Sequence, residues 1–220
     1  MKSDTSGMIE SFKWLGLIAM VVEHWMRFVV GEVPDWVYQV GRIAFPLFVL
    51  SLALGLRRQP LPKFWAVTKR MLVWALIAQA CLQLVPAPEG QLNVLFTFTL
   101  GLAAVYGLSR WRPSFLLAIA LCAIGVVALW CEFGPIGVAF VATAVGVARA
   151  DDPPRAAWVA VAGWLVALAV PNGNHFALAA VPVALLVWRL DVSVPRLRGA
   201  FYWIYALQFP AYAAVRQWLV

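Results

Sequence analysis

The chain has 220 residues, of which 64% are hydrophobic and only 12% are charged, and its mean hydropathy is +0.84. So little charge excludes an ordinary soluble domain and predicts an all-α, polytopic membrane helix bundle. The formal net charge of +7 could suggest nucleic-acid binding, but an excess of Lys and Arg in cytoplasmic loops explains it more simply. We therefore expect membrane lipid, and no nucleic acid, as a partner.

Hydrophobic segments follow one another along the whole chain, which predicts a single membrane-embedded domain over residues 1–220. Several of the later segments are short for a full span of about 20 residues, so about nine transmembrane helices are expected, with eight as the alternative. The predicted segments are 12–30, 37–56, 64–85, 93–109, 114–131, 135–149, 156–170, 175–190 and 200–219.

The first segment carries ionisable groups at a depth where they are costly, which marks them as functional candidates. Glu23, His24 and Arg27 lie near its end. Eleven residues at about 100° each place Lys13 and His24 on one helical face, roughly 16 Å apart. The simpler interpretation is a helix with a Lys and an Arg that reach toward the interfaces and one packed histidine.

A second arginine, Arg42, lies inside the next segment and needs a partner if it is buried. Glu23 is the first candidate and Glu132 the second. A purely structural ion pair between Glu23 and Arg42 is the alternative to a functional one. Asn93 and His175 are expected at the same end of the bundle.

The loops alternate in charge, and this alternation predicts the orientation. With nine spans and a cytoplasmic N-terminus, all 17 Lys and Arg residues except Arg27, Arg42 and Arg216 fall on the cytoplasmic side. Such an asymmetry is typical of multi-pass membrane proteins. Both histidines, His24 and His175, fall on the outer side.

A cluster of cations is expected at the cytoplasmic end. It either serves orientation alone or binds a polyanion such as the phosphates of a nucleotide-like donor. Its members are Arg57, Arg58, Lys63, Lys69 and Arg70, with Arg110 and Arg112 nearby.

An intramembrane histidine can act as a general base, and neighbouring charges can stabilise an oxyanion. Together with the cytoplasmic cations, this arrangement favours group transfer from a cytoplasmic donor to an acceptor on the far side. A proton-coupled transporter would use the same residue types, and the residue pattern alone does not separate the two.

Five blocks of the sequence resemble the TraX family in order and spacing. They are FKWLGLIAMVVEHW (12–25), GRIAFPLFVLSLALGL (41–56), NVLFTFTLGLAAV (93–105), EFGPIGV (132–138) and FYWIY (201–205). The resemblance implies a bacterial inner-membrane acetyltransferase of a conjugation system, which uses acetyl-CoA to modify the N-terminal amine of a pilin subunit. The family is similar to the acyltransferase-3 group, in which a basic residue precedes a catalytic His by eleven positions, as Lys13 precedes His24.

Two positions depart from the family pattern. Glu23 stands where relatives usually have Asp, and Gln208 stands where their closing block usually has His. Glutamine can donate and accept hydrogen bonds but cannot act as a base. A role of that second histidine is therefore lost or has moved, with His175 as the candidate.

The polar residues of the outer side, the cytoplasmic cations and the resemblance together give three groups of expected site residues. The expected catalytic residues are His24 as base, Glu23, which orients His24 or pairs with Arg42, and Arg42 or Asn93, which stabilises the oxyanion. The expected substrate-binding residues are Arg27, Glu132, His175 and Gln208. The expected acetyl-CoA contacts are Lys13, Arg57, Arg58, Lys69, Arg70 and Arg110. No metal is expected, because Cys81, Cys122 and Cys131 have no ligand spacing. A small proton-coupled transporter and a non-catalytic assembly factor of a conjugation or secretion apparatus are the alternative functions.

Overall fold

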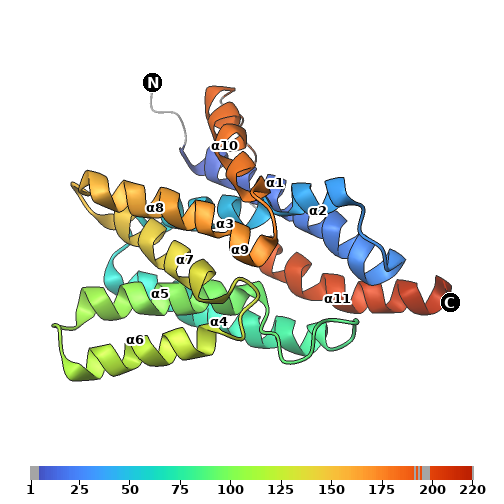
Figure 1. The fold of residues 1–220 in the computed structure, drawn as a ribbon, viewed down its shortest axis with the longest axis horizontal. Coiled ribbons are helices and arrows are strands. Elements are labelled where there is room, and N and C mark those ends of the chain that lie inside the picture. The colour runs from blue at the N-terminus through green and yellow to red at the C-terminus, as the bar shows by residue number, and fades with distance from the viewer. Residues whose placement is uncertain (1–4, 191, 193, 195–198, 220) are drawn as a thin grey trace.

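The structure is a computed structural model that describes residues 5–190, 192, 194 and 199–219. These residues form helices without a strand, so the all-α prediction is confirmed for the described part of the chain (Figure 1). The helices are α1 (Thr5–Trp25), continued by the π-helix η1 (Met26–Val30), α2 (Asp35–Gly41), α3 (Ala44–Leu56), α4 (Leu61–Leu82), α5 (Val94–Arg110), α6 (Phe115–Ala128), α7 (Gly134–Arg149), α8 (Arg155–Ala167), α9 (Ala169–Asn172), the 3-10 helix η2 (Phe176–Ala179), α10 (Ala180–Arg189) and α11 (Ala200–Leu219).

Each predicted hydrophobic segment coincides with one helix or with two consecutive helices of the described residues. By length and composition, two helical segments within those residues could cross a membrane, Asp35–Leu56 and Arg155–Asn172. Four further apolar helices are shorter. The bundle is therefore compatible with membrane association, whereas the number of spans stays a prediction.

Six of the described helices pack as a closed ring. Going round it, α1 contacts α3, α3 contacts α7, α7 contacts α5, α5 contacts α4, α4 contacts α11, and α11 returns to α1 (Figure 1). The helices α6, α8 and α10 pack on the outside of this ring. Side chains that point inward from six helices can therefore meet in one place.

Small residues let the ring helices approach closely, as is common in membrane bundles. A Cβ atom at Gly101 of α5 would lie only 2.6 Å from Val141 Cγ1 of α7. Phe45 of α3 stacks on Phe133, just before α7, with ring centroids 4.0 Å apart. The first contact joins the middles of α5 and α7, and the second joins the start of α3 to the start of α7.

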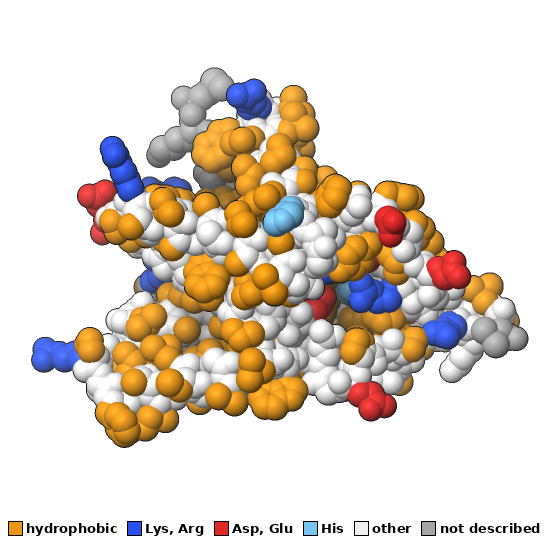
Figure 2. Space-filling model, viewed as in Figure 1, with side chains coloured by type: hydrophobic (Ala, Val, Ile, Leu, Met, Phe, Trp, Pro, Cys, Tyr) orange, Lys and Arg blue, Asp and Glu red, His pale blue; other side chains and the backbone are white. Residues whose placement is uncertain are grey.

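The outer helices expose large apolar side chains, which cover much of the face in Figure 2. Phe115 of α6 is 80% exposed and Val159 of α8 is 69% exposed. Exposed apolar surface of this extent is typical of a face that contacts membrane or another protein. This surface is compatible with membrane association of the bundle.

Arg149, the last residue of α7, ties α7 to the turn between α3 and α4. Its Nη1 donates hydrogen bonds to the carbonyl oxygens of Leu56 at 2.7 Å and Gln59 at 2.9 Å. Its guanidinium also lies 4.8 Å from the centre of the Phe64 ring. The end of α3 therefore obtains from a side chain the donors that its last carbonyl groups lack.

Replacing Arg149 with Ala should lower the free energy of unfolding by about 1–3 kcal/mol, because two carbonyl groups lose a charged donor. Thermal unfolding in detergent measures the effect. Arg155→Ala, which removes an exposed arginine at the start of the next helix, is the matched control. Equal melting temperatures for the two variants would contradict this role of Arg149.

Candidate active site

A buried carboxylate with two arginines lies at the centre of the candidate site. Glu23, near the end of α1, is 3% exposed. Its Oε1 accepts hydrogen bonds from Arg27 Nη2 at 2.5 Å and from Arg42 Nη2. The prediction that Glu23 is the partner of Arg42 is therefore confirmed.

Arg42 is held from further sides by residues that the sequence did not indicate as site residues. Its guanidinium lies 4.3 Å from the centre of the Tyr38 ring, and its Nη1 donates to Asn172 Oδ1 at 3.4 Å. The Tyr38 hydroxyl donates to the Asn172 carbonyl oxygen at 2.9 Å. Asn172 is 2% exposed although it precedes a Gly–Asn turn, and nothing in the sequence of this turn indicated its burial.

Gly41 provides the space for the Glu23 carboxylate. It is the last residue of α2, and a Cβ atom at this position would overlap the Glu23 carboxyl group. A glycine is therefore needed here for close approach rather than for its backbone conformation.

His24 follows Glu23 and lies among side chains of η1 and α11. Its ring centroid is 5.4 Å from that of Phe28 and 5.7 Å from that of Phe209. The side chain of Gln208 also lies beside the imidazole. Among the described residues, the buried His24 Nδ1 has no hydrogen-bond partner, so this nitrogen is available to a substrate or a water molecule.

The imidazole faces a cavity of about 30 Å³, enough for one or two water molecules. Figure 2 shows a recess in which acidic, basic and histidine side chains lie together. Residues from α1, η1 and α11 and from the segments that follow α4 and precede α5 and α7 line the cavity. Its polar lining comprises His24, Arg27, Gln91, Asn93, Glu132 and Tyr205.

Glu132 is the second carboxylate of the cavity and differs from Glu23 in its partners. It lies in the turn before α7, where its N–H donates to the Leu92 carbonyl oxygen at 3.0 Å. Burial raises the pKa of the Glu132 carboxyl, while Arg42 and the Val94 backbone act in the opposite direction. No ion pair joins Glu132 to another residue of the described ranges.

Asn93 lines the cavity but is already occupied by structural hydrogen bonds. Its Oδ1 accepts from Leu95 N–H at 3.0 Å and caps α5, and its Nδ2 donates to Ala75 O and Gln79 Oε1, each at 2.9 Å. Stabilisation of an oxyanion by Asn93 would require one of these donor bonds to break.

Tyr205 is a cavity residue that the sequence analysis did not select. It is 5% exposed, and its side chain lies against the backbone of Val94 and close to Glu132. The sequence feature that could have identified Tyr205 as a site residue is its position in the FYWIY block, at the start of α11.

The predicted acetyl-CoA contacts lie toward the opposite end of the bundle. Lys13 Nζ pairs with Glu10 Oε1 at 2.7 Å and lies 5.6 Å from the centre of the Phe201 ring. Arg70 lies beside Tyr202, one residue further along α11. The remaining cations of this group are exposed side chains, Arg57, Arg58, Lys69 and Arg110.

His175 is exposed at the start of η2, and it is not among the described residues that line the cavity. Gln208, from the closing block, therefore lies beside His24 in the structure, and His175 does not.

Replacing Gly41 with Ala should displace Glu23 from Arg42 and destabilise the fold by about 3–5 kcal/mol, because a buried ion pair is broken. Gly55→Ala is the matched control, since a Cβ there meets nothing within 4 Å and a helical Gly→Ala change stabilises by about 0.5–1 kcal/mol. Denaturant unfolding of both purified variants measures the difference. If Gly41→Ala is as stable as Gly55→Ala, the close contact with Glu23 does not exist.

Comparison with known proteins gives one consistent result. The profile of the family described as TraX protein matches residues 8–216. A Protein TraX of Escherichia coli is 30% identical over 186 residues, which cover 82% of this chain and 71% of the relative. A Protein TraX of Escherichia coli strain K12 is 28% identical over 151 residues, 66% of this chain and 58% of the relative. No solved structure matches the chain. Since the family profile extends over nearly all of the sequence, the chain belongs to the TraX family.

Proposed function

We propose that the protein is a membrane acyltransferase that moves an acetyl group from cytoplasmic acetyl-CoA to an amine at the outer end of the bundle. The observation that carries this proposal is His24, whose Nδ1 has no partner among the described residues and which lines a small cavity at one end of the helix ring. The acceptor we propose is the N-terminal amine of a conjugative pilin subunit, on the basis of the family resemblance.

The proposal places the bundle in the bacterial inner membrane as a multi-pass protein with a cytoplasmic N-terminus. The apolar surface of the outer helices supports this placement, since it suits contact with lipid tails. The alternating directions of α3, α4, α5 and α7 support it as well, because they bring Arg57, Arg110 and Arg149 to one end of the ring.

His24 is the proposed general base. Glu23 lies next to it in the sequence, but its Oε1 is already engaged by Arg27 and Arg42, so this oxygen is not available to the proton of an amine. His24 has no such cationic partner and has a free nitrogen. It therefore accepts the proton while the amine nitrogen attacks the acetyl carbon.

Arg27 is the residue that we propose to stabilise the oxyanion that forms in this step. It lines the cavity, and among the described groups its buried Nε has no hydrogen-bond partner. The tetrahedral intermediate then breaks its carbon–sulfur bond, and His24 returns the proton to the leaving sulfur. The products are an acetylated amine and free CoA.

The cations at the other end are proposed to bind the phosphates of CoA. Arg57, Arg58, Lys69, Arg70 and Arg110 have no ion-pair partner among the described residues, whereas Lys13 is paired with Glu10. The pantetheine arm would run from the Lys13 level to His24, about 16 Å along α1.

Replacing His24 with Ala should abolish acetyl-CoA-dependent transfer while the protein stays folded, because the variant lacks the proposed proton acceptor of the cavity. CoA release by the purified protein, with an amine peptide as acceptor, measures this effect. Val22→Ala, on the exposed side of the same helix, is the control. Full activity of the His24 variant would rule out this mechanism, and a folded wild-type protein without turnover would favour transport or an assembly role.

Replacing Arg70 with Ala should weaken CoA binding about tenfold or more, since a charged hydrogen bond contributes about 1.5–3 kcal/mol. Equilibrium dialysis with labelled CoA measures the affinity. The control is Arg112→Ala, which removes an exposed arginine from the turn between α5 and α6. An equal loss in both variants would mean that only general charge attracts CoA.

A further inference from the structure

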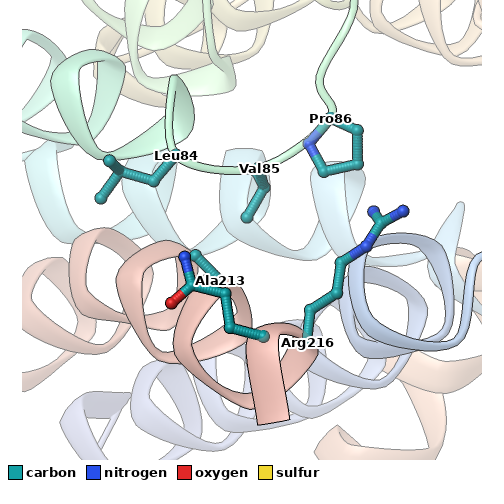
Figure 3. A pocket seen from close by; sticks show the side chains of 6 residues that line it. Leu84, Val85, Pro86, Ala213 and Arg216 are labelled. Atoms are coloured by element: carbon teal, nitrogen blue, oxygen red, sulfur yellow. The ribbon is translucent and has the colours of Figure 1, made fainter. Parts of the chain in front are cut away.

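A second hollow, much larger than the cavity, lies beside it at the outer end of the bundle. It has a volume of about 500 Å³, within the usual range of ligand pockets. We call it the α11 groove; it is lined by Leu84, Val85, Pro86, Ala213, Arg216 and Gln217. Figure 3 shows the loop after α4 facing α11 across this groove.

The α11 groove and the cavity share their dividing wall. The 82–88 loop, which starts at the last residue of α4, contributes Leu84 and Pro86 to the groove and Leu82 and Pro88 to the cavity. On the opposite side, Arg216 Nη1 donates to the carbonyl oxygen of Phe28 at 3.5 Å, and Phe28 lines the cavity. One loop and one aromatic residue therefore separate the groove from His24.

The lining of the groove suits a peptide chain. Its walls are apolar except at Arg216 and Gln217, which offer hydrogen-bond donors and an amide oxygen. Unlike Arg27 and Arg42, Arg216 has no carboxylate partner among the described residues. Besides Nη1, which donates to Phe28, its guanidinium has further N–H groups that can donate to carbonyl oxygens or to an acidic side chain of a ligand.

We propose that the α11 groove binds the N-terminal segment of the polypeptide acceptor and directs its terminal amine past the 82–88 loop to His24. This inference rests on the proposed acetyl transfer, because an acceptor with a reactive end must have its next residues close to the cavity. The groove meets this requirement, because the 82–88 loop lines both the groove and the cavity. The enzyme would then distinguish a chain with an apolar start from a small amine.

The test compares a short acceptor with a long one. Glycinamide supplies an amine alone, and a decapeptide with an apolar N-terminal half supplies an amine and a chain. Ala213→Trp narrows the groove, and Arg216→Ala removes its donor. We expect kcat/KM for the decapeptide to fall about tenfold or more through KM, and kcat/KM for glycinamide to change less than about twofold.

Two variants serve as matched controls. Ala214→Trp adds the same side chain to the neighbouring exposed position of α11, and Arg155→Ala removes an exposed arginine at the start of α8. Both control variants should have the wild-type kcat/KM for glycinamide and for the decapeptide. Retained turnover of glycinamide also shows that a groove variant is folded, and if Ala213→Trp does not fold, Arg216→Ala still gives the comparison.

Binding of a C-terminally labelled decapeptide, followed by fluorescence anisotropy, separates this inference from the proposed function. No turnover with either acceptor, together with peptide binding that the groove variants lose, refutes acetyl transfer but keeps the groove as a peptide site. Equal effects of a groove variant on both acceptors overturn the inference. The inference is also overturned if the groove variants keep the wild-type kinetics with the decapeptide but lose phospholipid that co-purifies with the wild type. That result would identify the groove as a lipid site.

Discussion

The buried Glu23 carboxylate is the constraint on which the arrangement of the cavity end of the bundle depends. A buried charge is costly unless it is paired and hydrogen-bonded, and Glu23 receives both arginines within reach. This pairing draws together α1, the turn between α2 and α3, and the segment of Asn172, which binds Arg42 from the other side. Because His24 is the next residue after Glu23, the same pairing fixes the position of the imidazole.

The helix ring explains why the polar groups meet where they do. The outer faces of α6 and α8 are apolar, so ionisable side chains can be accommodated only toward the interior or at the ends. Helix starts supply much of the polar lining, since Asn93 caps α5 and Glu132 precedes α7. In the proposed reaction, this enclosure would keep bulk water from the thioester, and it would leave the ends of the ring as the routes for donor and acceptor.

The sequence predicted the helices and the Glu23–Arg42 pair because both follow from local rules. Apolar segments of sufficient length form helices, and an arginine within such a segment requires a carboxylate. Tyr38, Asn172 and Tyr205 could not be predicted in the same way, since their roles depend on which helices become neighbours. Asn93 shows the converse: it was predicted near the site and lies there, but its hydrogen bonds are used by the α5 cap and Gln79. The number of spans also stays a prediction, because several helices of the described residues are shorter than a full span.

Gln208 limits how the proposed reaction can move its proton. Its Nε2 donates to the Tyr205 carbonyl oxygen at 3.0 Å, and its Oε1 accepts from the Tyr212 hydroxyl at 3.3 Å. These bonds fix the amide beside His24, where it can orient the imidazole but cannot take a proton from it. A relay through a second histidine, as the usual family pattern would allow, is therefore absent at this position. In the proposed mechanism, His24 must keep the proton that it takes from the amine until the sulfur leaves, so a single residue serves as base and then as acid.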